Sequence, residues 1–322
     1  MLLIKLVLVL VFLFLGAGWL TWIERRLLGS FQLRPGPNRA GPFGVFQPLA
    51  DIVKLITKED VSPRDSDRLI FLYAPSLVAI TALLIFAVVP FADNLTFCKY
   101  DIPMLISDIN TGILFVMALS SLSVYGVVLG GWASGSKFSV LGGIRAAAQM
   151  IGYELSLGLS LVPIVMLAGS FSLREIVEAQ AAYPFILVQP LAFIIFFLSA
   201  VAEAKRLPFD IPEAENELVA GYHTEYSGMR FGLYFLGEYV TMVVMGALIS
   251  VFFLGGWRGP ILPSFVWFMI KTSATVFVLI WFRATFPRLR YDQLLHLGWK
   301  VLVPAALINI MITGFVILAA GG

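Results

Sequence analysis

The chain has 322 residues, of which 59% are hydrophobic and 13% are charged, and its mean hydropathy is +0.91. This composition excludes a soluble globular protein and is typical of a membrane protein with several spans, and the small net charge of +2 argues against a nucleic-acid partner. The single cysteine, Cys98, excludes an intrachain disulfide and a cysteine ligand set for an iron–sulfur cluster, and we predict no metal site.

Apolar runs of about 17–25 residues, long enough to cross a bilayer, predict eight transmembrane helices. They lie near residues 2–22, 70–92, 108–131, 147–169, 186–203, 232–254, 264–283 and 300–320. The first run lacks a small-residue cleavage site, so we interpret it as a retained helix rather than a signal peptide. The prediction is an all-α polytopic membrane protein, with residues 1–322 forming a single membrane domain.

Basic residues are concentrated in the loops that follow the odd-numbered helices. These loops hold 17 of the 22 basic residues, whereas the loops on the other side hold only Lys99, Arg174 and Arg258. The positive-inside rule therefore places the odd loops, which we expect to be structured, in the cytoplasm or a mitochondrial matrix. Both termini are predicted to face the outer (periplasmic) side.

The first inner loop contains an amphipathic helix, predicted at about residues 45–58. Within QPLADIVKLITKED at 47–60, apolar residues recur at i, i+3, i+4 and i+7 from Leu49. Such a helix can lie in the membrane interface and anchor the loop. Alternatively, it can form a wall of a pocket for an amphiphilic ligand, with Asp51 or Lys54 turned inward.

The third inner loop, about 204–231, is acidic. Seven carboxylates lie between residues 203 and 238: Glu203, Asp210, Glu213, Glu215, Glu217, Glu225 and Glu238. Asp210 and Glu213 fit a capping box that begins a short helix. Capping does not explain the next three acids, Glu215, Glu217 and Glu225. Carboxylates this close in sequence are expected to repel one another, which raises the pKa of some of them. Carboxylates that hold or pass protons near neutral pH need a pKa raised in this way.

Charged residues also occur within or beside the predicted spans. Glu154 lies about two turns inside its helix, where no cap role is available, and intramembrane acids usually mark an ion, proton or substrate path. Glu203 and Glu238 either extend to the interface or join Glu154 in a proton relay. Lys271 is a candidate to balance one of these acids. Three arginines of the last inner loop are either topology signals or bidentate partners of carboxylates: Arg283, Arg288 and Arg290.

Several long blocks resemble the H subunit of NADH:quinone oxidoreductase (respiratory complex I), the bacterial counterpart of mitochondrial complex I core subunit 1. They are WIERRLLG at 22–29, FQLRPGPNRAG at 31–41, QPLADIVKLITKED at 47–60, GWASGSKFSVLGGIRAAAQMIGYE at 131–154, FDIPEAENELVAGYHTEYSGMRFGLYFLGEY at 209–239 and IWFRATFPRLRYDQLLHLGWK at 280–300. The blocks follow the family's order over almost the whole chain. The resemblance implies a membrane-arm subunit that forms much of the quinone chamber and couples quinone reduction to proton translocation.

The resemblance also implies roles for individual residues. Quinone binding would involve Glu24, Arg25, Arg34, Asp51, Lys54, Glu59, Asp210 and Tyr226. The proton relay would comprise Glu154, Glu203, Glu213, Glu215, Glu217, Glu225 and Glu238, supported by Arg283, Arg288 and Arg290. Lys205 stands where the family leads us to expect an uncharged polar residue, and it is a candidate partner of Glu203.

The same resemblance implies the reaction's other components. The bound substrate would be a quinone, either ubiquinone or menaquinone, and FMN and iron–sulfur clusters would lie only on partner subunits. The chain would act as part of the enzyme without a redox centre of its own. Its partners would be other membrane-arm subunits, the quinone-proximal subunits of the peripheral arm, and lipid. The expected location is the bacterial inner membrane rather than the mitochondrial one.

Three alternatives compete with this interpretation of the sequence. One is the equivalent subunit of a membrane-bound hydrogenase or formate hydrogenlyase, although the complete acidic loop favours the quinone enzyme. Another is an independent ion transporter, for which inverted repeats and broken helices are typical, and the sequence indicates neither. The third is a structural anchor without chemistry, which Glu154 argues against.

Overall fold

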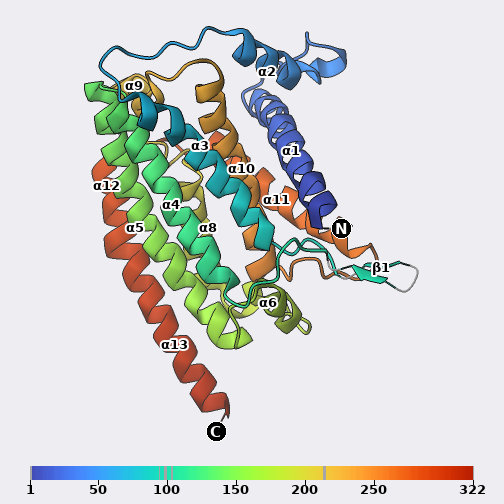
Figure 1. Ribbon diagram of the computed structural model, residues 1–322. Coiled ribbons are helices and arrows are strands. Elements are labelled where there is room, and N and C mark those ends of the chain that lie inside the picture. Colours follow the sequence, from blue (N-terminus) through green and yellow to red (C-terminus); the bar gives the residue numbers. More distant parts are fainter. Residues whose placement is uncertain (1, 94, 98–99, 103, 213–214, 322) are drawn as a thin grey trace.

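The computed structural model describes residues 2–93, 95–97, 100–102, 104–212 and 215–321. Long helices stand side by side in a bundle (Figure 1), and one antiparallel hairpin, β1 (Leu95–Phe97) with β2 (Tyr100–Ile102), projects from it. Within the described residues, seven helical stretches are long and apolar enough to cross a membrane. The prediction of an all-α polytopic membrane protein is therefore confirmed.

Seven of the eight predicted spans correspond to these stretches. Five are single helices: α1 (Leu2–Phe31), α4 (Gly112–Ala133), α5 (Lys137–Ala168), α10 (Gly228–Phe253) and α11 (Ser264–Thr285). The second span is α3 (Arg68–Ile85), continued by the 3₁₀ turn η2 (Phe86–Val88). The last span comprises α12 (Tyr291–His296), a π-helical segment, η4 (Leu297–Leu302), and α13 (Val303–Gly321).

The remaining span is broken, so the expectation of unbroken helices is wrong here. It consists of α7 (Phe185–Val188) and α8 (Pro190–Glu203), which meet at the non-helical residue Gln189. Proline disfavours a helical conformation in the residue before it, which accounts for the break at Gln189. The buried Gln189 amide bonds to α13, because Nε2 donates to Thr313 Oγ1 at 2.9 Å and Oε1 accepts from Asn309 Nδ2 at 3.0 Å.

Two helices extend further than their apolar runs. α1 ends at Phe31 rather than near residue 22, and α5 begins at Lys137 rather than near residue 147. Four of the 17 basic residues predicted to lie in inner loops therefore fall within the added parts of these two helices instead: Arg25 and Arg26 in α1, and Lys137 and Arg145 in α5. The loop backbone at Tyr222 covers this added part of α5 at Gly142. A Cβ atom on residue 142 would lie only 2.6 Å from the backbone nitrogen of Tyr222. Glycine lets the loop backbone rest directly on the helix.

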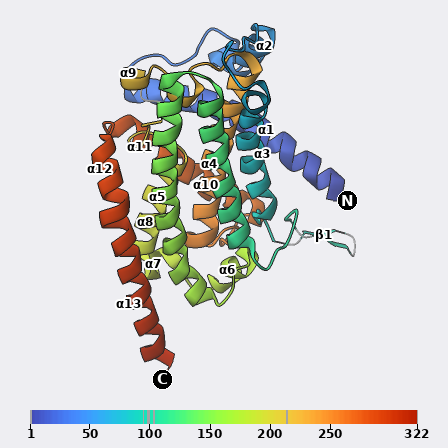
Figure 2. The same ribbon diagram turned by 60° about the vertical axis from the view of Figure 1, so that its left-hand side comes forward.

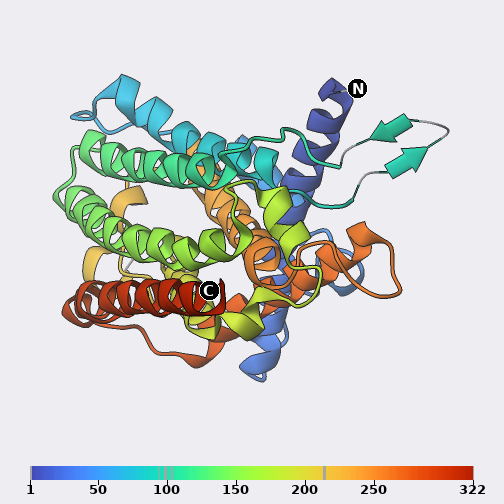
Figure 3. The ribbon, with the colours of Figure 1, turned by 90° about the horizontal axis from the view of Figure 1, so that it is seen from below.

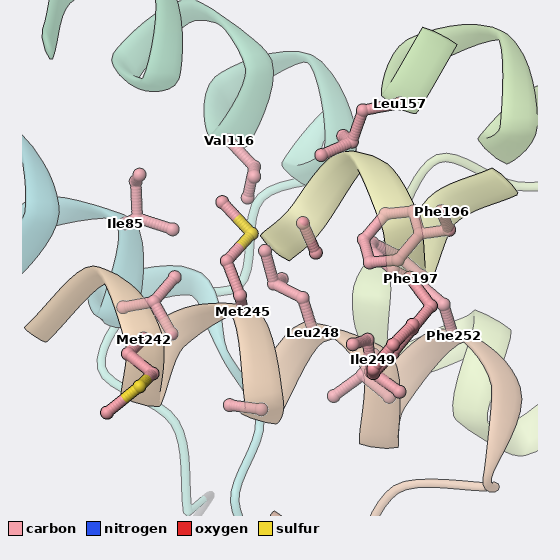
Figure 4. Close-up of a cluster of buried hydrophobic side chains, with 14 of the residues drawn as sticks. Ile85, Val116, Leu157, Phe196, Phe197, Met242, Met245, Leu248, Ile249 and Phe252 are labelled. Carbon is pink, nitrogen blue, oxygen red and sulfur yellow. The ribbon is translucent and has the colours of Figure 1, made fainter. Parts of the chain in front are cut away.

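The hydrophobic core surrounds α10. Figure 4 shows side chains of α3, α4, α5 and α8 converging on it, including Ile85, Val116, Leu157 and Phe196, with Met245 and Leu248 of α10 between them. Leu248 is fully buried, which places α10 in the interior of the bundle. A charged group on α10 is thus shielded from lipid by the surrounding helices.

The polar segments gather at one end of the bundle. α2 (Gln47–Thr57), within the stretch predicted to be an amphipathic helix, and α9 (Glu215–Leu218) lie there with the 3₁₀ turns η1 (Pro42–Gly44) and η3 (Gly221–His223), whereas α6 (Leu173–Ala179) and the hairpin lie at the other end (Figures 1 and 2). α1 is inclined to the bundle, while α4, α5 and α13 run alongside one another (Figure 3). The loops predicted to be cytoplasmic share the end that carries α2 and α9.

Candidate functional site

A buried carboxylate on α1, Glu24, is held by groups from three other segments. Glu24 is 1% exposed and accepts a hydrogen bond from Arg283 near the end of α11. Arg206 Nη1, in the loop after α8, lies 3.5 Å from Glu24 Oε1, and its guanidinium lies 4.5 Å from the ring centroid of Tyr239 on α10. Tyr239 also hydrogen-bonds to Glu24. We call these four residues the Glu24 cluster.

Asp210 lies in the loop after α8, where the sequence predicted the start of a helix. Residues 210–212 are not helical, so the helix does not begin directly after Asp210, and Glu213, the predicted capping partner, lies outside the described residues. Instead, Asp210 Oδ2 accepts a hydrogen bond from Arg288 Nη2 at 3.0 Å. Burial raises the pKa of the Asp210 carboxyl, the nearby charge of Glu238 adds to the rise, and the Arg288 guanidinium opposes it.

Replacing Arg288 by methionine is expected to make the stability of the protein more dependent on pH. A carboxyl whose pKa is raised by folding contributes stability at low pH that is lost as the pH rises through the raised pKa. Without the guanidinium, the pKa of Asp210 rises further, so the variant should be destabilised most at neutral pH and approach wild type in mild acid. Thermal midpoints of the purified parent complex across this pH range test this.

The control for Arg288→Met is Arg290→Met. Arg290 pairs with its neighbour Asp292, through Nε to Oδ1 at 2.6 Å and Nη2 to Oδ2 at 2.7 Å, and both side chains are exposed. Its loss should leave the pH dependence unchanged. A stability difference between wild type and Arg288→Met that is constant over the pH range would contradict the assigned role.

A second group of polar side chains continues from the loop into α10. Lys205, two residues after Glu203, is 6% exposed, and its Nζ lies 3.4 Å from the hydroxyl oxygen of Tyr222 and 4.8 Å from that ring's centroid. The Tyr222 hydroxyl in turn donates to Glu238 Oε1 at 2.8 Å. Glu238 therefore does not extend to the interface; it lies 8% exposed within the protein.

Glu203 and Glu154 meet two adjacent serines of α4. Ser120 Oγ donates to Glu203 Oε1 at 2.9 Å, and Ser121 donates to Glu154. Glu203 is buried and Glu154 is half-buried, and the two carboxylates interact electrostatically. The acids of α5 and α8 are thus brought together inside the bundle, beside a hydroxyl pair that sequence reasoning missed.

The structure connects α1 and α2 through an ion pair. Arg25 Nη1 lies 2.7 Å from Asp51 Oδ2, and Gln47 Nε2 donates to Asp51 Oδ1 at 3.1 Å. The Asp51 side chain is therefore turned toward α1, whereas the Lys54 side chain is exposed on the protein surface. This contact joins two of the residues that the resemblance assigned to the quinone chamber.

Three other residues predicted to bind quinone take no part in the Arg25–Asp51 ion pair: Arg34, Glu59 and Tyr226. Arg34 is exposed and donates to Gln32 Oε1 at 2.7 Å, and Glu59 is exposed. Tyr226 is buried and stacks on Phe71 with ring centroids 4.1 Å apart, and burial raises the pKa of its hydroxyl to about 12. The structure does not bring Tyr226 together with the Arg25–Asp51 pair.

The remaining loop acids are only partly described. Glu213 and the side chain of Glu215 lie outside the described residues. Glu217 is exposed and its Oε2 lies 2.5 Å from Arg145 Nη1, while Glu225 is half-buried. Arg145, at the extended start of α5, thus faces the acidic loop.

Lys271 is positioned away from the predicted relay. Its Nζ donates to the carbonyl oxygens of Leu254, Gly256 and Arg258, at 2.6, 3.0 and 2.6 Å, beyond the C-terminal end of α10. A cavity of about 840 Å³ opens there, and it is lined by none of the residues assigned to quinone binding. Lys271 therefore binds backbone carbonyls just beyond the C-terminal end of α10. The acidic loop lies at the other, N-terminal end of this helix.

Comparison with known proteins identifies the family. The family model described as NADH dehydrogenase matches residues 4–314. The chain is 62% identical over 317 residues to NADH-quinone oxidoreductase H subunit 2 of Syntrophobacter fumaroxidans, covering 98% of this chain and 96% of the relative. It is 61% identical over 302 residues to H subunit 2 of the same enzyme in Geobacter sulfurreducens, covering 94% and 92% of the two chains. The chain therefore belongs to the H-subunit family of NADH-quinone oxidoreductases, and it is a multi-pass membrane subunit of that enzyme complex.

Proposed function

We propose that this chain forms much of the quinone-binding chamber at the junction with the peripheral arm and couples quinone reduction to proton translocation through a chain of carboxylates. The observation that carries the proposal is the placement of four acids in the bundle and at its loop end, each hydrogen-bonded to a side chain of another segment. Asp210 and Glu238 lie near the loop end of the bundle, and Glu203 and Glu154 lie between α4, α5 and α8.

The chamber is proposed to lie beside α1 and α2. The Arg25–Asp51 ion pair fixes charged groups between these helices, and the Glu24 cluster closes the adjacent space between α1, α10 and α11. Paired charges of this kind can orient the polar head group of a quinone, while the exposed apolar side chains of α1 and α2 suit its isoprenoid tail. Ubiquinone and menaquinone both fit this description.

Quinone reduction consumes two electrons and two protons. In the proposed function the electrons come from FMN and iron–sulfur clusters on the quinone-proximal subunits of the peripheral arm. The change of charge in the chamber alters the field at Asp210 and Glu238 and so drives protons along the acids toward neighbouring membrane-arm subunits. The bacterial origin of the relatives and the excess of basic residues in the loops at the α2 end favour a bacterial inner membrane with that end in the cytoplasm.

Photo-crosslinking with an azido-quinone tests the chamber. The purified parent complex is irradiated with the probe, and labelled peptides of this chain are mapped. Label within residues 24–60 or 205–226 that excess quinone removes is the expected result. Label confined to partner subunits would overturn the chamber and leave this chain only the roles of docking and proton relay.

A further inference from the structure

We propose that Ser121 of α4 is a positioning residue for Glu154, because its rotatable hydroxyl gives this acid a hydrogen-bond partner in both protonation states. The inference rests on the proposed function, since a partner for both states matters only if Glu154 gains and loses a proton during turnover. It deepens that function by assigning a role in the relay to a residue that is not a carboxylate.

The Ser121 hydroxyl oxygen lies within hydrogen-bond distance of two acceptors. One is the backbone carbonyl oxygen of Met117, one turn earlier on α4, at 3.1 Å. The other is Oε1 of Glu154 on α5, the helix that runs alongside α4 (Figure 3). A serine hydroxyl carries one hydrogen, so the two acceptors compete for it.

The protonation state of Glu154 decides which acceptor receives that hydrogen. An ionised carboxylate offers only acceptors, so Ser121 then donates to Oε1. When Oε1 carries a proton, its O–H donates to the Ser121 oxygen, and the hydroxyl hydrogen turns to the Met117 carbonyl. This carbonyl has two lone pairs and can accept the hydroxyl in addition to its helical N–H partner. The contact between Ser121 and Glu154 is thus kept in both states, with opposite direction.

The surroundings of Glu154 give this exchange its value. Glu154 and Ser121 are both half-buried on membrane helices. A polar group that is removed from water without a hydrogen-bond partner costs free energy, and a charged group costs more. A carboxyl with a partner in only one protonation state would therefore be held in that state. Ser121 provides a partner in each, so Glu154 can alternate between them.

The contact with Met117 alone would not distinguish Ser121 from other helix serines, which commonly donate to a carbonyl of the preceding turn. Ser160 on α5 shows this ordinary case, since it is buried and its hydroxyl donates to the Leu157 carbonyl at 2.6 Å. Ser121 differs because its oxygen also meets an acid of the neighbouring helix. The combination of the two contacts on one hydroxyl carries the inference.

The step moves one proton and no electrons. Glu154 takes a proton from the chain of acids as the Ser121 hydroxyl turns to Met117, and it returns the proton to the chain as the hydroxyl turns back. Ser121 keeps its own hydrogen throughout. It therefore positions the acid and does not itself carry the proton.

Ser121→Ala in the parent complex tests the role of the hydroxyl. We expect quinone-linked turnover and proton translocation to fall by about tenfold, the lower end of what a hydrogen bond to a charged group contributes. NADH oxidation by an artificial acceptor should not change. Ser121→Thr keeps a hydroxyl and should turn over close to wild type, and the matched control Ser160→Ala should do the same. Equal losses in Ser121→Ala and Ser121→Thr, or in Ser121→Ala and Ser160→Ala, would overturn the role of Ser121.

Combining Ser121→Ala with Glu154→Gln separates failure of this inference from failure of the proposed function. Because Ser121 acts through Glu154, the double variant should be no slower than Glu154→Gln alone, and a further loss would overturn the role of Ser121. If Glu154→Gln is slow and Ser121→Ala is normal, the relay stands and the role of Ser121 is overturned. If Glu154→Gln itself turns over and translocates protons normally, the proposed relay through Glu154 is overturned, and the role of Ser121 with it.

Discussion

Arg283→Met is expected to destabilise the protein, by less than the ~3–5 kcal/mol that breaking a fully buried ion pair costs, because the Arg283 side chain is 31% exposed whereas that of Glu24 is 2% exposed. Glu24 would stay buried, and its charge would still be opposed by Arg206, whose Nη1 lies 3.5 Å from Glu24 Oε1. The hydrogen bond that joins α1 to α11 would be lost as well. We expect a lower thermal midpoint of the parent complex and less of this chain retained on purification.

The double variant Glu24→Gln, Arg283→Met should recover part of this loss, because it removes the buried charge that Arg283→Met leaves without its hydrogen-bonding guanidinium. The recovery is only partial, because the ion pair between Glu24 and Arg206 is lost as well. Arg290→Met serves as a second comparison, since its exposed pair with Asp292 contributes little. If the single and double variants are equally destabilised, the damage comes from lost packing at Arg283 and not from the buried charge of Glu24.

The membrane helices could be predicted from the sequence because a span needs a long apolar run and little else. The same criterion misplaced the C-terminal end of α1 and the N-terminal start of α5, because both helices extend beyond their apolar runs. Arg25 continues α1 and pairs with Asp51 on α2, and Arg145 continues α5 and pairs with Glu217. A hydropathy pattern ends where the apolar run ends, whereas these helices are stabilised further by contacts with loop segments.

The partners of the buried acids could not be predicted from local patterns. Arg283 meets Glu24 across 259 positions of the chain, and Arg288 meets Asp210 across 78 positions. The local sequence around Asp210 favoured a capping role equally well. Only the packing of α11 and the following loop against α1 and α8 decides between the two roles, and that packing is a tertiary property.

The serines of α4 were missed for a different reason. α4 is apolar around its whole circumference, so no periodic pattern indicates which face turns toward α5 and α8. Ser120 and Ser121 resemble the small polar residues that membrane helices use for close packing. Their proximity to Glu203 and Glu154 in space, rather than their type, distinguishes them.

Glu154→Gln is expected to leave the complex assembled and to lower quinone-linked turnover by about tenfold or more, since a proton-transfer group typically contributes at least that much. Glutamine keeps the shape of the side chain and an oxygen that accepts the hydrogen bond from Ser121, but it cannot bind and release the proton. A proton bound to Glu154 also changes the charge that Glu203 meets, so the substitution disturbs both acids.

The assay for Glu154→Gln compares quinone-linked NADH oxidation and proton translocation with NADH oxidation by an artificial acceptor, which should stay normal. Glu178→Gln is the control: Glu178 forms an exposed i, i+4 pair with Arg174 on α6, at the end of the bundle away from the acidic loop. Its turnover should match wild type, because a screened surface pair contributes little. Normal proton-coupled turnover in Glu154→Gln would show that Glu154 is not part of the relay. The proton path would then not pass through the acid on α5.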